Sequence, residues 1–399
     1  MKGLIYYEHT RFWRSGKNIV VLLAFAVVLL GLFVFNTILD KSYWSKQTEL
    51  LYDELTAINN EISAVEAQTE TAERNNPEDT EALEELARQY DYYRSQYLYN
   101  YQQRTLARLY SPERAQERIE LAIERDKHIL KGLEAGYDFL GQTQEQVKQR
   151  IGVNEYIIQQ EITPLNSPHE MNATNFLSQL IDYPWILAIL IALALLSIDI
   201  FSGDIEGGAY KHLYSQPINR GRIFAVKYLV RFFYSFIIVT GLIALVFGIV
   251  YMLNGLGSTG YPMYYYGESY QSLDTTGTLA YLPWSEYMLK TIPLYCFLCL
   301  FVMLLIGAAS LLLQNTGNTL NASFCILVLD FLGRTLFPAE SKFYMFWPLT
   351  AAGVNRVLQG AYTISALAYL ILLSIAAILL FVGGQTVLRK QDLTGGIGL

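Results

Sequence analysis

The stretch "SGDIEGGAYKHLYSQPINRGRIFAVK", residues 202–227, is the part of the chain that decides the fold class. It is polar, with an acidic pair beside glycines, a Ser-Gln-Pro turn and then spaced cations, and a long apolar run lies on each side of it. A helix needs about 20 apolar residues to cross the hydrocarbon core of a bilayer. A short polar segment between two runs of about that length is typical of a loop that connects two membrane spans.

The composition of the 399-residue chain divides into two populations. Overall, 52% of the residues are hydrophobic and 16% are charged, but residues from about 40 to 182 are strongly polar and most of the remainder is apolar. The net charge of −7 comes mainly from the polar block. This division predicts a membrane protein with one inserted soluble domain, and it argues against a single large soluble core.

Six apolar runs have the length of a membrane span. They cover residues 18–39, 183–201, about 229–253, about 289–313, about 319–337 and about 363–384, the last four within 228–399. Residues 1–17 mix apolar and aromatic side chains with cations, which predicts a short helix in the membrane interface. We therefore expect an all-α membrane protein with an interfacial N-terminal helix, six transmembrane helices and a helical or coiled-coil domain inserted at 40–182.

The positions of lysine and arginine predict the orientation, because short cytoplasmic loops are enriched in both. Cations precede the first span, recur in residues 202–227 and follow the sixth span, whereas the loop at about 254–287 has none. We expect a multi-pass plasma-membrane protein with both termini and residues 202–227 in the cytoplasm. The polar block and the loops at about 254–287 and 338–362 would then be extracellular.

The polar block contains two apolar seams with a period near 3.5 residues, which packed antiparallel or coiled-coil helices require. The seam positions are Leu51, Leu55, Ile58, Ile62 and Val65, then Leu83, Leu86, Tyr90, Tyr93 and Tyr97. Thr143 and Gln146 have the spacing of a capping box at the start of a further helix. These patterns predict a bundle of about four helices.

Six tyrosines crowd residues 90–101 of this block. Tyrosine combines a large apolar area with a polar tip, which suits a surface that contacts a peptide or protein. The simpler interpretation is that the seam tyrosines only pack the bundle. Tyr92, Tyr99 and Tyr101 lie off the seam, and we predict that they are exposed and available to contact a ligand.

No catalytic constellation is recognisable. The sequence lacks the phosphate-binding pattern GxxxxGK[ST], and its four histidines are scattered without metal-ligand spacing, so we predict a non-enzymatic chain with no catalytic residues and no metal site. Ionisable groups inside spans are costly and often functional. Asp199 ends the second span, and Asp330 and Arg334 lie four positions apart in the fifth. Two roles remain open for these residues. In the structural role, Asp199 is an acid at the level of the lipid headgroups, and Asp330 and Arg334 form an internal ion pair. The other is a functional role.

Several motifs together resemble the permease subunit of ABC-2 type transporters. That family carries an acidic pair with glycine after its second span, then a turn with proline and arginine, and then a lysine that opens the third span. The stretches "GAASLLLQNTGNTL", residues 307–320, and "LRKQDL", residues 388–393, are similar to the family as well. The residues that the resemblance assigns to ATPase coupling are Asp204, Glu206, Gly207, Gly208, Pro217, Arg220 and Lys227.

The resemblance implies a transport subunit driven by a separate chain. Residues 202–227 would dock on an ATP-binding subunit present in two copies, which would bind the ATP and magnesium, so this chain would need no cofactor. A second permease, identical or homologous, would complete a dimer that exports a peptide, a lipid or a hydrophobic compound; no nucleic acid is implied. The alternative is a receptor or scaffold that senses a ligand through its helical ectodomain without transport.

Overall fold

The computed structural model describes residues 2–109, 111–266, 279–337, 341, 344, 347–362 and 364–390. Within this part of the chain, six helical segments are long and apolar enough to cross a membrane, which confirms the prediction of six spans. They are α2 (Gly16–Asn75), the segment Ile186–Glu206, α10 (Arg220–Asn254), α11 (Trp284–Leu313), α12 (Thr316–Leu336) and α15 (Ala366–Lys390). The chain is therefore a multi-pass membrane protein.

The chain forms two compact units. The first comprises residues 1–33, 172–257 and 263–399, and the second comprises residues 34–171 and 258–262. Helix α2 contributes residues to both units. Residues 172–182, which the sequence analysis placed in the polar block, group with the first unit, where they include α6 (Ala173–Ile181).

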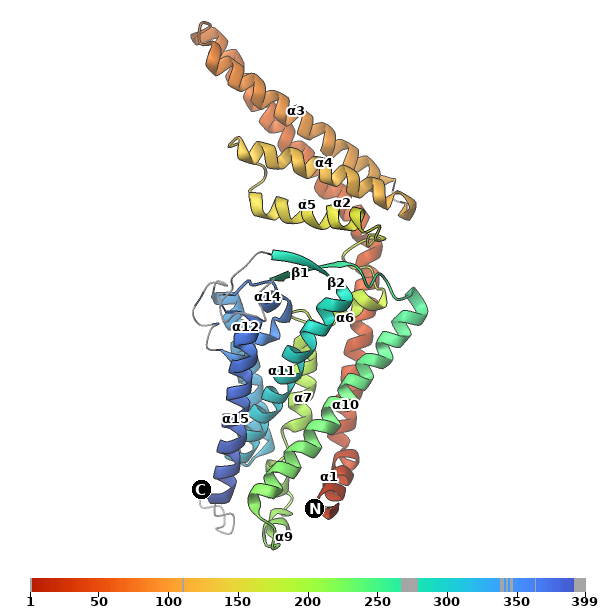
Figure 1. Ribbon diagram of the computed structural model, residues 1–399, viewed down its shortest axis with the longest axis vertical. Coiled ribbons are helices and arrows are strands. Elements are labelled where there is room, and N and C mark those ends of the chain that lie inside the picture. Colours follow the sequence, from red (N-terminus) through yellow and green to blue (C-terminus); the bar gives the residue numbers. More distant parts are fainter. Residues whose placement is uncertain are drawn as a thin grey trace. The chain divides into compact units, whose positions relative to one another are not determined.

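The first unit is a bundle of apolar helices. Helix α11 packs against α7 (Ile186–Ser197) and α15, and α10 packs against α15 and against α1 (Lys2–Arg14). One end of this unit carries the N-terminus, the last turn of α15 and the two short helices α8 (Ser202–Glu206) and α9 (Tyr210–Tyr214) (Figure 1). We call this end the α9 end.

An aromatic cluster packs the bundle near the α9 end. Phe201, Phe224 and Tyr228 are buried together, and the hydroxyl group of Tyr228 donates a 2.7 Å hydrogen bond to the carbonyl oxygen of Leu304. Gly307 lies against the tyrosine ring, where an added Cβ would be 2.1 Å from the hydroxyl oxygen. Only glycine therefore lets α11 approach Tyr228 this closely.

The segment between α10 and α11 contains structure that the sequence did not predict. Strands β1 (Pro262–Tyr266) and β2 (Leu279–Pro283) pair in a two-stranded sheet within the loop at about 254–287. The chain is thus mostly but not wholly helical. Residues 267–278 of this loop, and residues 391–393 of the "LRKQDL" motif, lie outside the described residues. Short helices η2 (Pro348–Ala352) and α14 (Val354–Leu358) precede α15.

The second unit is a helical domain built from the distal part of α2 and three further helices. These are α3 (Thr80–Arg108), α4 (Ala115–Glu134), which follows the single turn η1 (Pro112–Arg114), and α5 (Gln144–Gln159). Of the first predicted seam, Leu51, Leu55, Ile58 and Val65 are buried. The capping box at Thr143 and Gln146 is present, with each side chain bonded to the other residue's backbone N–H, which confirms that prediction.

Candidate functional site

Four charged side chains from three helices meet in the interior of the first unit near its α9 end. Lys227 of α10 donates a 2.7 Å hydrogen bond to Glu8 of α1 and lies 2.5 Å from Asp204 of α8. Arg11, one turn after Glu8 in α1, donates a 2.5 Å hydrogen bond to the other carboxylate oxygen of Asp204. Lys227 is fully buried, and Asp204 and Glu8 are only 1% and 3% exposed. We refer to Glu8, Arg11, Asp204 and Lys227 as the buried ion cluster.

The buried ion cluster contains two acids and two bases, so its formal charge is zero. Removing one partner from such a set leaves an uncompensated buried charge, which typically costs about 3–5 kcal/mol. The cluster therefore holds α1, α8 and α10 in one arrangement, because each charge depends on partners from other helices. Of the four residues, only Asp204 and Lys227 were singled out from the sequence.

The lack of a side chain at Gly203 leaves room for the Arg11 guanidinium group beside α8. The Arg11 guanidinium group donates a 2.6 Å hydrogen bond to the carbonyl oxygen of Asp199 and a 3.4 Å hydrogen bond to that of Ile200. A Cβ at Gly203 would lie 2.5 Å from Nη2 of Arg11. A larger residue at this position would displace the guanidinium group from these carbonyl oxygens, a close approach that the sequence alone did not show.

The environment also affects titration on α1, which lies outside the spans. Burial alone would lower the pKa of Arg11, but the nearby carboxylates of Asp204 and Glu8 outweigh it and raise the pKa above its ordinary value. Burial also raises the pKa of Tyr7, and the Asp204 charge adds to that effect. Arg11 therefore stays cationic and Tyr7 neutral over the physiological range.

Asp199 lies beside the buried ion cluster and has its own partners. It accepts a 2.8 Å hydrogen bond from Lys17 at the start of α2, and Nη2 of Arg231 lies 3.5 Å from the same carboxylate oxygen. Arg231 is 2% exposed, and its guanidinium group lies over the ring of Phe12. The acid near the end of the second span thus bridges α2 and α10 through these ion pairs.

The short helix α8 has two further connections in the same unit. The hydroxyl group of Ser310 in α11 accepts hydrogen bonds from the backbone N–H groups of Phe201 and Ser202, at 3.2 and 3.0 Å. The carboxylate of Glu206 accepts 2.7 Å hydrogen bonds from the backbone N–H and the hydroxyl group of Thr316, the first residue of α12. Ser310 and Thr316 both lie in the "GAASLLLQNTGNTL" motif. A displacement of α8 would therefore act directly on α1, α10, α11 and α12.

The exposed side chains of residues 207–219 lie mainly on α9 and in the turn that follows it. Gly208 has a φ of +70°, a left-handed conformation that favours glycine, and it separates α8 from α9. Lys211 and His212 on α9 are exposed, as are Ser215, Gln216 and Pro217 in the following turn. Asn219 caps α10 by accepting a 2.8 Å hydrogen bond from the N–H of Gly221.

The predicted coupling residues therefore differ in burial: some are buried in the bundle, and the others are exposed or half-buried. Asp204 and Lys227 are buried, so they cannot contact a partner directly and can act only through the helices that they hold. Gly207 and Pro217 are exposed, Glu206 is exposed but bonded to Thr316, and Gly208 and Arg220 are half-buried. The exposed surface belongs to α9 and its flanking turns.

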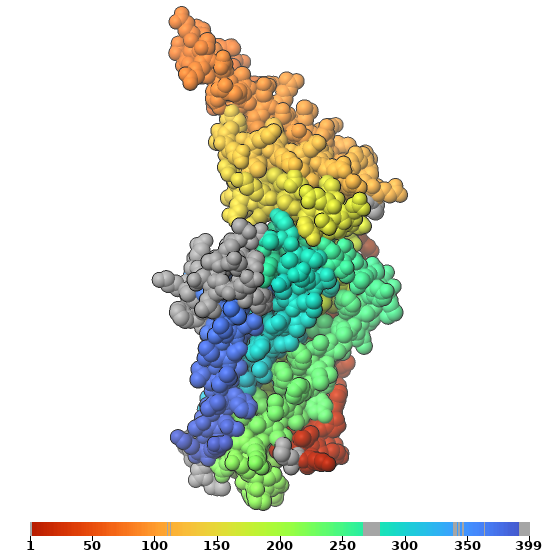
Figure 2. Space-filling view, in the orientation of Figure 1, coloured from red at the N-terminus to blue at the C-terminus, as the bar shows by residue number. Residues whose placement is uncertain are grey.

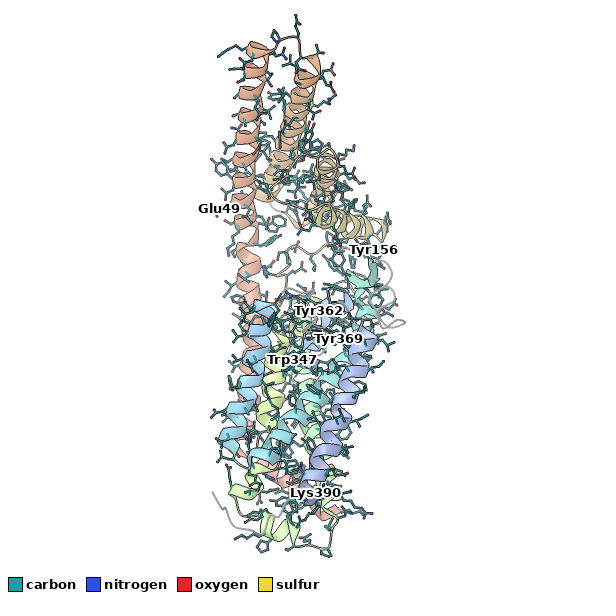
Figure 3. The ribbon with its side chains drawn as sticks, turned by 90° about the vertical axis from the view of Figure 1, so that its left-hand side faces the viewer. Glu49, Tyr156, Trp347, Tyr362, Tyr369 and Lys390 are labelled. Atoms are coloured by element: carbon teal, nitrogen blue, oxygen red, sulfur yellow. The ribbon has the colours of Figure 1, made fainter. Side chains whose placement is uncertain are left out.

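Asp330 and Arg334 form a separate polar node in the first unit. Nε of Arg334 donates a 2.9 Å hydrogen bond to Asp330, and the other carboxylate oxygen accepts 2.8 Å from the indole N–H of Trp347. Arg334 also donates to the hydroxyl oxygen of Tyr362 and to the carbonyl oxygen of Leu349. Trp347 and Tyr362 lie far from Lys390, at the other end of the bundle (Figure 3). The node is a satisfied internal pair that fastens α12 to the segment 347–362.

The tyrosines of the second unit do not all lie where the sequence placed them. Tyr92 is only 7% exposed, so the prediction that it lies on the surface is wrong. Its ring stacks on His128 of α4 at a centroid distance of 4.8 Å. Helix α3 packs against α4 as well as against α2, so the buried face of α3 is wider than the predicted seam. Tyr99 is half-buried and also contacts His128, whereas Tyr101 is exposed.

The described residues contain no group of three or more His, Cys, Asp or Glu side chains arranged to hold a metal ion. The site instead combines a buried ion cluster with an exposed, partly basic helix at one end of a six-span bundle.

Comparison with protein families shows to which family the chain belongs. Residues 8–393 match the ABC-2 family transporter proteins, so the chain belongs to this family of transporter membrane subunits. The match covers nearly the whole chain and confirms the resemblance inferred from the motifs. Comparisons with curated proteins and with solved structures find no match.

Glu8, Arg11, Gly203 and Ser310 were not predicted from the sequence. Glu8 and Arg11 carried a usable signal, since opposite charges three positions apart lie on the same face of a helix and can form an ion pair. Nothing in the sequence paired them with Asp204 and Lys227, because those contacts span 193 and 219 positions.

Proposed function

We propose that this chain is the membrane-spanning permease subunit of an ATP-driven exporter, and that α9 and its flanking turns dock on a separate ATP-binding subunit. One observation carries the proposal beyond family membership. The helix that precedes this exposed surface, α8, is bonded to α1, α10, α11 and α12 through Asp204, Ser202 and Glu206. A displacement of α9 would therefore be transmitted through α8 to α1, α10, α11 and α12.

In this mechanism the ATPase supplies motion and the permease converts it into a change of the spans. The buried ion cluster makes α1, α8 and α10 move together, since separating them would expose unpaired charges to an apolar interior. The exposed Lys211 gives α9 a positive charge that suits acidic side chains on the partner. Two ATP-binding subunits and a second permease, identical or homologous, would complete the transporter. Export of a peptide, lipid or hydrophobic compound is the expected reaction.

Purification of the tagged chain from its own cells in mild detergent tests the proposal. We expect a co-purifying protein that carries the phosphate-binding pattern GxxxxGK[ST] and hydrolyses ATP. Lys211→Glu should reduce the amount of this ATPase without changing the thermal unfolding of the permease. Arg14→Glu is a matched control, because Arg14 is exposed on α1 and the change in charge is the same. If both variants retain the ATPase fully, α9 is not the docking element.

A further inference from the structure

The second unit carries a groove between α3 and α4 that the proposed function does not use. Its volume is about 530 Å³, within the range of about 300–1,000 Å³ typical of ligand pockets. Helix α3 contributes Tyr101 and Leu106, and helix α4 contributes Glu117, Glu120, Leu121 and Glu124. Helices α3 and α4 pack together, and Figure 2 shows the side chains of α4 forming part of this unit's surface.

The carboxylates of the groove are only partly compensated within the protein. Arg114 forms a bidentate pair with Glu117, at 2.7 and 2.9 Å. Glu120 accepts one 3.1 Å hydrogen bond from the amide of Gln116, and Glu124 has no ion pair among the described side chains. Both acids are exposed and lie one helical turn apart, where like charges repel. A cation placed between them would remove this repulsion.

The groove is also apolar enough to hold more than a simple ion. Leu106 is 6% exposed and forms part of its floor with Leu121, while Tyr101 is 53% exposed at its edge. A tyrosine face attracts cations, and the aliphatic stems of lysine and arginine pack on apolar surface while their charged ends reach carboxylates. The chemistry of the lining therefore matches a ligand with cationic groups and aliphatic groups side by side.

The charge of the whole unit favours the same class of ligand. Residues 34–171 contain 25 acidic and 14 basic side chains, so they carry more than the net negative charge of the full chain. A surface with such an excess of one sign raises the local concentration of ligands of the opposite sign.

We propose that this groove binds a short cationic, amphipathic peptide segment. Lysine or arginine side chains of the peptide contact Glu120 and Glu124, and its aliphatic side chains pack on Leu106 and Leu121 beside Tyr101. The groove follows α4 from Arg114 to Glu124, which at about 1.5 Å per residue is about 15 Å. An extended segment of about five residues covers this length at about 3.3 Å per residue.

Binding is measured on the full chain in nanodiscs of zwitterionic lipid, by fluorescence anisotropy of a labelled five-residue peptide of alternating lysine and leucine. We expect the double variant Glu120→Gln and Glu124→Gln to weaken binding by about tenfold or more, because charge-assisted contacts are lost. Tyr101→Ser should weaken it as well. The matched control is Glu66→Gln with Glu70→Gln, two exposed acids with the same spacing and charge on α2, which should change the affinity less than twofold.

Three outcomes would overturn the proposal. The first is failure of the peptide to bind the wild-type chain at low salt. The second is equal weakening by the groove variant and the α2 control, which would assign binding to net charge. The third is equal affinity for a peptide in which glycine replaces leucine, or for spermidine, which would assign the groove to cations without apolar side chains. The test involves no ATPase, so its result is independent of the proposed transport function.

Discussion

The ammonium group of Lys227 lies 2.7 Å from the carboxylate of Glu8, although 219 positions separate them in the sequence. This contact joins the start of the third span to the N-terminal helix. It is one of the bonds that make the buried ion cluster a single unit.

Loss of Lys227 should destabilise the first unit strongly. Lys227→Met leaves two carboxylates for one guanidinium group in a buried site, an imbalance that typically costs about 3–5 kcal/mol. Combining it with Glu8→Gln restores neutrality and should recover much of the loss. Thermal unfolding in detergent, followed by tryptophan fluorescence, measures both. Lys390→Met, at an exposed position, is the control, and a similar melting temperature for Lys227→Met and this control would contradict the assigned role.

Gly203→Ala should disturb the same region by a steric route. The new Cβ would meet Nη2 of Arg11 at 2.5 Å, so the guanidinium group must leave the carbonyl oxygens of Asp199 and Ile200. Gly241→Ala on α10 has open space around its Cβ and should be neutral, or stabilising by up to about 1 kcal/mol, as expected for a helix interior. Protease resistance of α1 together with the melting temperature would distinguish them, and equal behaviour would refute the close approach of Arg11.

Tyr92 and Tyr101 should respond in opposite ways to truncation. Tyr92→Ser removes a buried ring and should destabilise the second unit by about 3–5 kcal/mol, whereas Tyr101→Ser should change its stability by no more than about 0.5 kcal/mol. The buried hydroxyl group of Tyr92 has no hydrogen-bond partner in the described part of the chain. Tyr92→Phe should therefore be neutral or stabilising, and a large loss in this variant would show a missing partner.

His128 should make the second unit less stable in mild acid. Burial is the main cause that lowers the pKa of His128, and Lys131 adds to it, although the hydrogen bond to the Tyr92 carbonyl acts in the opposite direction. The unfolded chain therefore binds a proton more readily than the folded one, so the free energy of unfolding falls as the pH drops below about 6.5.

The His128→Gln variant should lose this dependence. Hydrogen exchange of α3 and α4 peptides, compared at pH 7.5 and 5.5 after correction for intrinsic exchange rates, measures the effect. Histidines 9, 169 and 212 are present in both proteins, so they cancel in the comparison. An unchanged pH dependence in the variant would remove His128 as its source.

The membrane orientation is tested by single cysteines in a chain whose own three cysteines are replaced by alanine. Ser63→Cys, exposed on α2 in the second unit, should react with an impermeant maleimide added to intact cells. Gln216→Cys, exposed in the turn after α9, should react only after the membrane is opened. Labelling of Gln216→Cys from outside would reverse the proposed topology and rule out ATPase docking at α9.

Patterns in the sequence predicted the features that depend on residues close together in the chain. Six apolar runs predicted the spans, and Thr143 and Gln146 predicted a helix start. The spacing of Asp330 and Arg334 allowed an ion pair within one helix, which was one of the two roles left open for them. The features that were missed depend on distant segments. Tyr92 is buried because His128 lies against it, and Asp204 is buried because α1 and α10 supply its partners.

The buried ion cluster also has a consequence for biosynthesis. Asp204 follows Arg11 by 193 positions, and Lys227 follows Glu8 by 219, so at about 5–20 residues per second the ribosome completes the set roughly 10–40 s after it makes α1. Until then the charges of α1 must remain hydrated, since burial without partners is unfavourable. A chain that stops before Lys227 therefore lacks the partner that allows Glu8 to be buried.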